Sequence, residues 1–478
     1  MSNHDGYRLA YDYTVRFYPR YFTWMQFQIN SENSKQQGAG EKIANRLTGP
    51  LGMGPEYKVV VAINDDTIYA EAFLDVADEP VILTIPAYPN KYSVLQLDVY
   101  GNIFSTALSS APPSNGGVYA FVANGYSGTL PENAVKVEMP HTFTTIAIRT
   151  DKYSSTGEDL RVAANEFRSR LSLQTLGKYE PGGESGRTLV LPLYFFAPSV
   201  KLMADEGLAK APEAFLATVQ EAMASPMTQP VTSDDRALMR RFDAAFADAR
   251  EAVDYDSGPL TEIIRGAQAA YAAIINRWQS HRGSTNWIHF DNIGHWGTNY
   301  LDRAALTEYI QVGNDRTAAY YANAFVDASG LPLDGGSFAY TIQFTKDQLP
   351  QYQRFWSLTA YTPEYIELVP NAHDKYVVAS YTPDLEIADD GSVTIYVQAD
   401  PPKRASTANW LPVPRGHFSL LFRVYGPLGS ALDGTYVPPK IHRTFKRDAH
   451  EKHRAELLDI TRAPLSIAQP QEAGSPGQ

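Results

Sequence analysis

Two apolar segments in the first third of the chain carry tyrosines and polar residues at every second position. In IYAEAFL (68–74) these are Tyr69 and Glu71, and in YSVLQLDVY (92–100) they are Tyr92, Gln96, Asp98 and Tyr100. Successive side chains of a β-strand point to opposite faces, so each segment predicts a strand with one apolar and one polar face. As neighbours in one sheet, the two strands would share a cleft with stacking walls and an acid/base pair.

The carboxylates near these segments fit glycoside-type chemistry, which needs one protonated and one ionised carboxyl group on opposite sides of the bond. The catalytic candidates are Asp66, Asp98 and Glu71. The residues expected to bind a ligand beside them are Asn64, Thr67, Tyr69, Tyr92, Gln96 and Tyr100. Two alternatives stay open. Asn64, Asp66 and Thr67 also fit a turn that caps the strand, with Asp98 bonded to a buried partner, and the same oxygens fit a calcium-like site.

A second polar face is predicted near the C-terminus, in HFSLLFRVY (417–425). One parity of this strand is apolar from Phe418 to Val424, and the other carries Arg423 and Tyr425. Arg423 is able to clamp a ligand carboxylate with a fork of hydrogen bonds, although an internal ion pair is the favoured use. Trp356, in FWSLTAY (355–361), joins the candidate ligand-binding residues.

The segment QSHRGSTNWIHFDNIGHWGTNY (279–300) predicts a loop because of its Gly and Asn content. His289, Asp291 and His295 within it are weak candidates for a metal site of two histidines and one carboxylate. Their spacing matches no strong metal motif, so histidines satisfied by hydrogen bonds are favoured. No organic cofactor is expected, and a divalent metal is left open. No GxSxG, HExxH or Walker A motif occurs.

The periodicity of the chain predicts an α+β fold that is predominantly β, with two β-sandwich, jelly-roll-like units bracketing a helical insertion. An aromatic helix or helical pair is expected over 5–30. The β-type runs of the first unit are expected at 59–63, 68–74, 81–85, 92–100, 118–122 and 142–148. The expected organisation is an N-terminal helical segment and loop (1–57), a first β-domain (58–154), a mostly helical segment (155–320), a second β-domain (321–445) and a tail (446–478) whose end is disordered.

The composition of the chain limits the classes of molecule that it is expected to bind. The formal net charge of −12, from 41 basic and 53 acidic side chains, disfavours nucleic acid and anionic membrane surfaces. The absence of cysteine excludes disulfides, thiol nucleophiles and Cys-ligated metals. No segment approaches the roughly 18 apolar residues of a membrane span. Because no signal peptide can be read at the N-terminus, a cytoplasmic location is expected by default, or export if a leader was removed.

Two blocks of the chain resemble known but uncharacterised families. AINDDTIYAEAFLD (62–75) with PAYPNKYSVLQLDVYGNIF (86–104) is similar to domain of unknown function 1254. LPLDGGSFAYTIQF (331–344), FWSLTAYT (355–362), DDGSVTIYVQ (389–398) and NWLPVPRGHFSLLFRVYGP (409–427) resemble its usual partner, domain of unknown function 1214. The resemblance implies a two-part, largely β architecture of jelly-roll type and implies no chemistry.

We therefore expect a groove where the Tyr/carboxylate face of the first β-unit meets the Arg/Tyr face of the second. The leading expectation is an enzyme, hydrolase- or lyase-like, that acts on a small polar or carbohydrate-like substrate by carboxylate acid/base chemistry. A non-catalytic carbohydrate-binding or scaffold protein is the alternative, and a His-ligated metal enzyme is a weaker one. A small-molecule ligand is the expected partner, with homo-oligomerisation left open.

Overall fold

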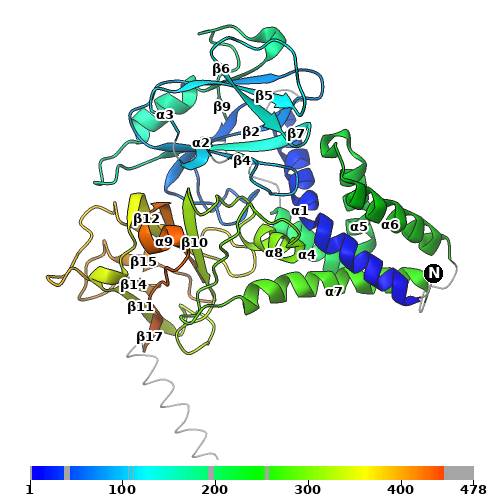
Figure 1. Cartoon of the computed structure of the whole chain (residues 1–478). Coiled ribbons are helices and arrows are strands. Elements are labelled where there is room, and N and C mark those ends of the chain that lie inside the picture. Colours follow the sequence, from blue (N-terminus) through cyan, green and yellow to red (C-terminus); the bar gives the residue numbers. More distant parts are fainter. Residues whose placement is uncertain are drawn as a thin grey trace, which may run out of the picture.

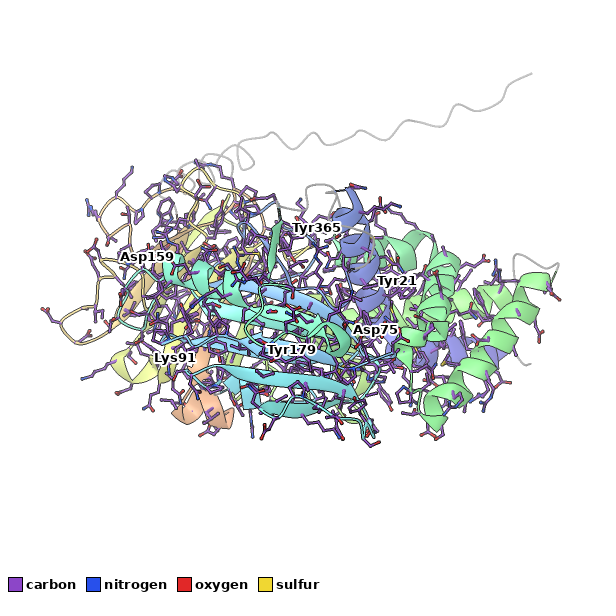
Figure 2. All side chains as sticks on the ribbon, turned by 90° about the horizontal axis from the view of Figure 1, so that it is seen from above. Tyr21, Asp75, Lys91, Asp159, Tyr179 and Tyr365 are labelled. Atoms are coloured by element: carbon purple, nitrogen blue, oxygen red, sulfur yellow. The ribbon has the colours of Figure 1, made fainter. Side chains whose placement is uncertain are left out.

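The computed structural model describes residues 3–36, 43–105, 107–110, 112–191, 199–252 and 258–445. Two β-regions lie next to a group of helices (Figure 1). Seen from above, the first β-region spans the boundary between the second β-region and the helices (Figure 2). Lys91 lies on the side of the second β-region, and Asp75 on the side of the helices.

The first β-region consists of two sheets that enclose an apolar core. One sheet has the order β4 (Tyr92–Leu97), β7 (Phe143–Asp151), β2 (Thr67–Asp75), β1 (Thr48–Pro50) and β9 (Leu189–Leu191). The other has the order β6 (Ala134–Met139), β5 (Gly117–Ala123), β3 (Val81–Ile85) and β8 (Ser172–Thr175). Alternate residues of β2, such as Ala70, Ala72 and Leu74, pack against Leu83 and Phe121 of the facing sheet. This region also contains α2 (Ala107–Ser110) and α3 (Arg161–Arg170).

The helices pack around one long N-terminal helix, α1 (Asn3–Gln36), which contains Pro19. The others are α4 (Val200–Lys210), α5 (Pro212–Ala224), α6 (Ser233–Glu251), α7 (Pro259–Ser280) and α8 (Tyr300–Tyr309). Aromatic stacking joins them: the ring of Tyr13 stacks on that of Phe242 of α6, and Tyr21 packs on Phe215 of α5. Short 3-10 helices lie at Leu176–Lys178, Pro226–Thr228 and Lys346–Gln348.

The second β-region repeats the two-sheet plan. One sheet has the order β10 (Ala319–Ala324), β16 (Ser419–Pro427), β12 (Tyr352–Tyr361) and β13 (Val377–Ala379). The other has the order β15 (Trp410–Pro412), β14 (Val393–Gln398), β11 (Phe338–Phe344) and β17 (Ile441–Phe445), and α9 (Gly429–Asp433) follows β16. Leu420, Phe422 and Val424 of β16 face the core between these sheets, which confirms the predicted parity of this strand.

The α+β fold class is confirmed, and the described residues form four open sheets that are antiparallel or mixed. The predicted strand at 59–63 is wrong, because this segment is a series of bends and turns in which Ala62 has a φ of 54°. Strand β10 was not predicted. The N-cap of α6 is Thr232, whose side chain accepts the backbone N–H of Asp235. The tail at 446–478 lies outside the described residues. None of the described helices is long and apolar enough to cross a membrane.

Candidate functional site

The sheet that contains β2 and β7 and the sheet that contains β10 and β16 face each other with their outer sides, and a cavity lies between them. The space open to the centre of a water molecule is about 30 Å³. That is room for a few small atoms, because one water needs roughly 10 to 15 Å³ by this measure. The walls combine β2, β7, β10 and β16 with the segment that joins β1 to β2. The lining residues are Met53, Tyr57, Val60, Val61, Ala62, Ile63, Asn64, Tyr69, Glu71, Arg149, Ile310, Val312, Tyr321, Arg423 and Tyr425.

Strand order decides which predicted residues reach this cavity. β7 lies between β2 and β4, and Arg149 of β7 pairs with Tyr69 on one side and Ser93 on the other. Paired residues point to the same face of a sheet. Tyr69 and Glu71 therefore share the outer face with Ser93 and not with Tyr92 and Gln96. The prediction of one shared polar face was wrong because alternation within each strand leaves the phase between strands open.

The turn before β2 is organised by Asn64. Its Oδ1 accepts the backbone N–H groups of Asp66 and Thr67, both at 3.1 Å, and the Thr67 hydroxyl at 2.9 Å. These bonds assign the oxygen of the amide and direct its Nδ2 to the Tyr425 hydroxyl of β16, 2.6 Å away. Asn64 and Thr67 thus form the predicted turn cap, and Asn64 also joins the two β-regions.

Asp66 is fully buried between the two β-regions. Its Oδ1 accepts the hydroxyl of Tyr381 at 2.5 Å and its Oδ2 accepts that of Ser357 at 2.9 Å. Burial raises the pKa of this carboxyl, against the opposing effects of the Tyr381 hydrogen bond and the nearby Arg423 charge. Asp66 does not line the cavity. Its hydrogen bonds make it part of the interface between the two β-regions, and its catalytic role remains a prediction.

Arg423 also forms contacts across the interface between the two β-regions. Its Nη2 donates to the backbone carbonyl of Ala62, and its guanidinium lies over the ring of Tyr361. Tyr361 in turn donates its hydroxyl to the carbonyl of Ile63. The segment that was predicted as a strand therefore gives its carbonyl groups to side chains of the second β-region and not to a sheet.

Glu71 is the only carboxylate among the described residues that line the cavity. Burial raises the pKa of its carboxyl to about 7, and the charge of Arg149 only partly opposes this. No hydrogen bond or ion pair ties the carboxylate to another residue of the described ranges. A carboxyl group in this state is half protonated near neutral pH and free to exchange a proton with a bound molecule.

Arg149 lies across the cavity wall with only 5% of its surface exposed. Its Nη2 donates to the carbonyl of Val312 at 3.1 Å, and its guanidinium lies 5.4 Å from the ring centre of Tyr69. Its Nε and Nη1 have no hydrogen-bond partner in the described structure. Among the described residues of the lining, Arg149 alone has buried side-chain nitrogens without a partner, and these donors are available to an acceptor in the cavity.

Two tyrosine hydroxyls complete the polar lining. The Tyr425 oxygen accepts the amide of Asn64, and the Tyr321 oxygen accepts both the backbone N–H and the side-chain amide of Asn314, at 3.1 and 2.8 Å. Each hydroxyl is therefore anchored as an acceptor. Its own proton has no acceptor in the part of the chain that the structure describes, which leaves it to donate to a molecule in the cavity.

Other predicted site residues lie elsewhere. Asp98 follows β4 and caps a turn: its Oδ1 accepts the backbone N–H groups of Tyr100 and Asn102 at 2.9 and 2.8 Å. Tyr92 and Trp356 are buried in the cores of the two β-regions. Gln96 is fully buried in β4 on the inner face, and its amide has no partner among the described residues. The hydroxyl of Tyr100 contacts Met223 of α5.

The weak metal triad is not assembled. His289 contacts Asp291 at 2.8 Å, but its other ring nitrogen lies 2.7 Å from the carbonyl of Tyr321. His295 lies instead near Asp315, at 3.9 Å. The described residues hold no group of three His, Cys, Asp or Glu side chains that is able to bind a metal ion. Hydrogen bonds to a backbone carbonyl and to one carboxylate account for His289.

Sequence reasoning missed Arg149 and Tyr321. Arg149 directly follows TFTTIAI (142–148) with the parity of Thr145 and Ala147, so a charge at the end of an apolar strand was the available signal. Tyr321 belongs to AYYANA (319–324), which is short and rich in Ala, and the sequence offered no reason to place it in a strand.

Comparisons with known proteins agree with this two-part layout. A family described as "Protein of unknown function (DUF1254)" matches residues 45–175, and one described as "Protein of unknown function (DUF1214)" matches residues 318–429. No curated protein matches the chain. The crystal structure of the VPA0106 protein from Vibrio parahaemolyticus is similar, with a TM-score of 0.57 and 19% identity over 92% of this chain and all of that one. An uncharacterised protein from Burkholderia cenocepacia has a TM-score of 0.44 and 14% identity, over 93% of this chain and 96% of that one. The Vibrio likeness supports the fold alone.

Proposed function

Because this chain belongs to the proteins that combine a DUF1254 domain with a DUF1214 domain, we propose that its function resides where the two domains meet. The chain is an enzyme that transfers a proton to or from a small polar substrate held in the cavity between them. Glu71 is the general acid/base. The observation that carries this proposal is a cavity-lining carboxyl group whose pKa is raised to about 7 and which no described neighbour holds in a hydrogen bond.

The environment of Glu71 differs from that of Glu308, a fully buried glutamate. Burial also raises the pKa of Glu308 on α8, but this carboxylate accepts the Tyr18 hydroxyl at 2.6 Å and pairs with Lys201. A carboxylate saturated in this way stabilises the helices and has no free oxygen to offer. No described residue bonds to either oxygen of Glu71, and its pKa lies near the pH at which proton transfer is most efficient.

The tyrosines give the reaction a second component. Removal of a proton beside a carbonyl group places negative charge on the carbonyl oxygen, and preorganised donors aimed at that oxygen lower the barrier. The hydroxyls of Tyr321 and Tyr425, anchored by Asn314 and Asn64, have protons available for this role. Glu71 would exchange the proton while the tyrosines hold the oxygen, as in a lyase-like elimination or an isomerisation.

This lining supports proton transfer better than glycoside hydrolysis. Hydrolysis of a glycosidic bond uses two carboxyl groups, roughly 5 to 9.5 Å apart. Glu71 has no second carboxylate beside it among the described lining residues, since Asp66 and Asp98 lie outside the cavity. The small volume also favours a compact polar substrate over an oligosaccharide.

Solvent-proton exchange tests the proposal and does not require that the product be identified. Small oxo- and hydroxy-acids and small sugars are incubated with the full chain in D₂O, and deuterium incorporation at carbon is followed by NMR. The wild type should exchange at least one compound, and Glu71→Gln should slow that exchange by roughly 10²- to 10⁴-fold. Glu308→Gln, which changes a buried glutamate outside the cavity, serves as the control. Equal exchange rates for wild type and Glu71→Gln would contradict the proposal.

A non-catalytic ligand-binding protein is the alternative that the same cavity supports. The unpaired donors of Arg149 favour it, because they would bind a polar molecule whether or not chemistry follows. The two functions separate in the same experiment. If none of the compounds that bind the wild type with saturation gains deuterium, the result supports the non-catalytic binding protein.

A further inference from the structure

We infer that the cavity recognises a small organic monocarboxylate and that Arg149 is the residue that binds its carboxylate group. The inference rests on the proposed function only in sharing its cavity, and it concerns the class of ligand and not the reaction. It follows from three properties of the cavity: the unpaired donors of Arg149, the local balance of charge, and the size of the space.

The first property is the set of unpaired hydrogen-bond donors on Arg149. A guanidinium carries five N–H donors, three of them on Nε and Nη1. In Arg149 these two nitrogens have no acceptor in the described structure and are shielded from bulk water. A buried charge without hydrogen-bond partners is costly. A carboxylate satisfies such donors better than a neutral acceptor because hydrogen bonds between ions are about twice as strong.

The charge balance points to an anion. Arg423, the other arginine of the lining, lies near Asp66 and donates to the carbonyl of Ala62, so its charge is partly neutralised within the protein. Arg149 forms no ion pair with any described residue, and the carboxyl group nearest to it in the cavity, Glu71, is half protonated near neutral pH. The described side chains of the cavity therefore carry excess positive charge, which one negative charge on a ligand would neutralise.

The size of the space and the remaining donors select a monocarboxylate. About 30 Å³ of open space fits a planar carboxylate with a short chain. A phosphate dianion is bulkier and would place a second negative charge beside Glu71, where like charges repel. With the carboxylate on Arg149, the hydroxyls of Tyr321 and Tyr425 remain to bind a second oxygen of the same molecule.

Calorimetric titration of the full chain tests the inference, with propionate and glycolate as probes and inorganic phosphate and chloride as competing classes. Both carboxylates should bind the wild type with saturation. Arg149→Gln should weaken them by roughly 10- to 100-fold, the loss expected for hydrogen bonds to a charged group. Arg20→Gln is the matched control, because Arg20 on α1 is fully buried and also has unpaired Nη1 and Nη2 atoms but does not line the cavity.

Loss of binding in Arg149→Gln with binding retained in Arg20→Gln supports the inference. Absence of saturable carboxylate binding, equal weakening by both substitutions, or tighter binding of phosphate or chloride overturns it. Should Arg149→Gln not fold, crystals of the wild type grown with 3-bromopropionate decide: bromine located in the cavity by anomalous scattering supports the assignment, and its absence there overturns it. Proton exchange that fails while carboxylates still bind through Arg149 would refute the proposed chemistry alone.

Discussion

The side-chain amide of Asn64 donates to the hydroxyl of Tyr425 across the boundary between the two β-regions, at 2.6 Å. Asn64 belongs to the DUF1254 match and Tyr425 to the DUF1214 match. Asp66 and Ser357 repeat the relationship, at 2.9 Å. Residues that carry the resemblance to each family thus bind each other, and the cavity exists only where the two domains are joined. This arrangement gives a physical reason for the two domains to occur in one chain.

Removing the Tyr425 hydroxyl should destabilise the interface between the two β-regions. In Tyr425→Phe the buried Asn64 amide loses its acceptor, so we expect the free energy of unfolding to fall by roughly 1 to 3 kcal/mol. Urea unfolding measures the change. Tyr365→Phe, at an exposed tyrosine, should change stability by less than about 0.5 kcal/mol. Equal effects of the two substitutions would show that the Asn64–Tyr425 bond contributes nothing.

The sequence predicted the fold class and the parity of β16. These features depend on local periodicity, which a single strand displays. The relation between strands is not local: β7 separates β2 from β4, and this placed Tyr92 and Gln96 in the interior while Glu71 faces the cavity. The apolar run at 59–63 lacks strand structure because Arg423 and Tyr361, which are distant in the sequence, bind its carbonyl groups.

Asp98 should behave as a turn cap. In Asp98→Asn the amide oxygen still accepts the backbone N–H groups of Tyr100 and Asn102, but the new NH₂ group faces the side-chain amide of Asn102, a donor that Asp98 Oδ2 now accepts at 2.8 Å. We expect a loss of roughly 1 to 2 kcal/mol in unfolding free energy, with carboxylate affinity unchanged within about twofold. A variant with normal stability and lost binding would return Asp98 to the ligand site.

The buried ion pair between Arg354 and Asp151 provides a test of the boundary that does not touch the cavity. Both side chains are almost fully buried, and Arg354 Nε donates to Asp151 Oδ2 at 3.0 Å. Arg354→Met leaves an uncompensated aspartate, so a loss of roughly 3 to 5 kcal/mol is expected. The double variant Arg354→Met/Asp151→Leu should recover a large part of that loss in urea unfolding. No recovery would mean that the charges are not coupled.

The segment 51–61 forms part of the cavity wall and has no regular secondary structure. Few backbone bonds hold it, among them Leu51 N–H to Leu191 O and Tyr57 N–H to Gly54 O. Its amides should therefore exchange with solvent faster than those of β2 and β16, and saturating propionate should slow them. Hydrogen-exchange mass spectrometry measures both. Exchange as slow as in β16 would show that the cavity does not open by this route.

The raised pKa of Glu71 makes stability depend on pH in a defined direction. The folded protein holds this proton more tightly than the unfolded chain, because the pKa of the carboxyl is about 7 in the fold against the ordinary value of 4.5. The contribution of Glu71 to stability is therefore fully present below pH 4.5 and is lost as the pH rises through about 7. The loss is on the order of 3 kcal/mol.

Glu71→Gln removes this titration but keeps the size of the side chain. The variant should match the wild type near pH 4.5 and become more stable than it as the pH approaches 8, and urea unfolding across that range measures the difference. The charged and titratable groups that share the cavity are Arg149, Arg423, Tyr57, Tyr69, Tyr321 and Tyr425. A constant difference between variant and wild type at every pH would place the Glu71 proton outside the range that proton transfer in this cavity requires.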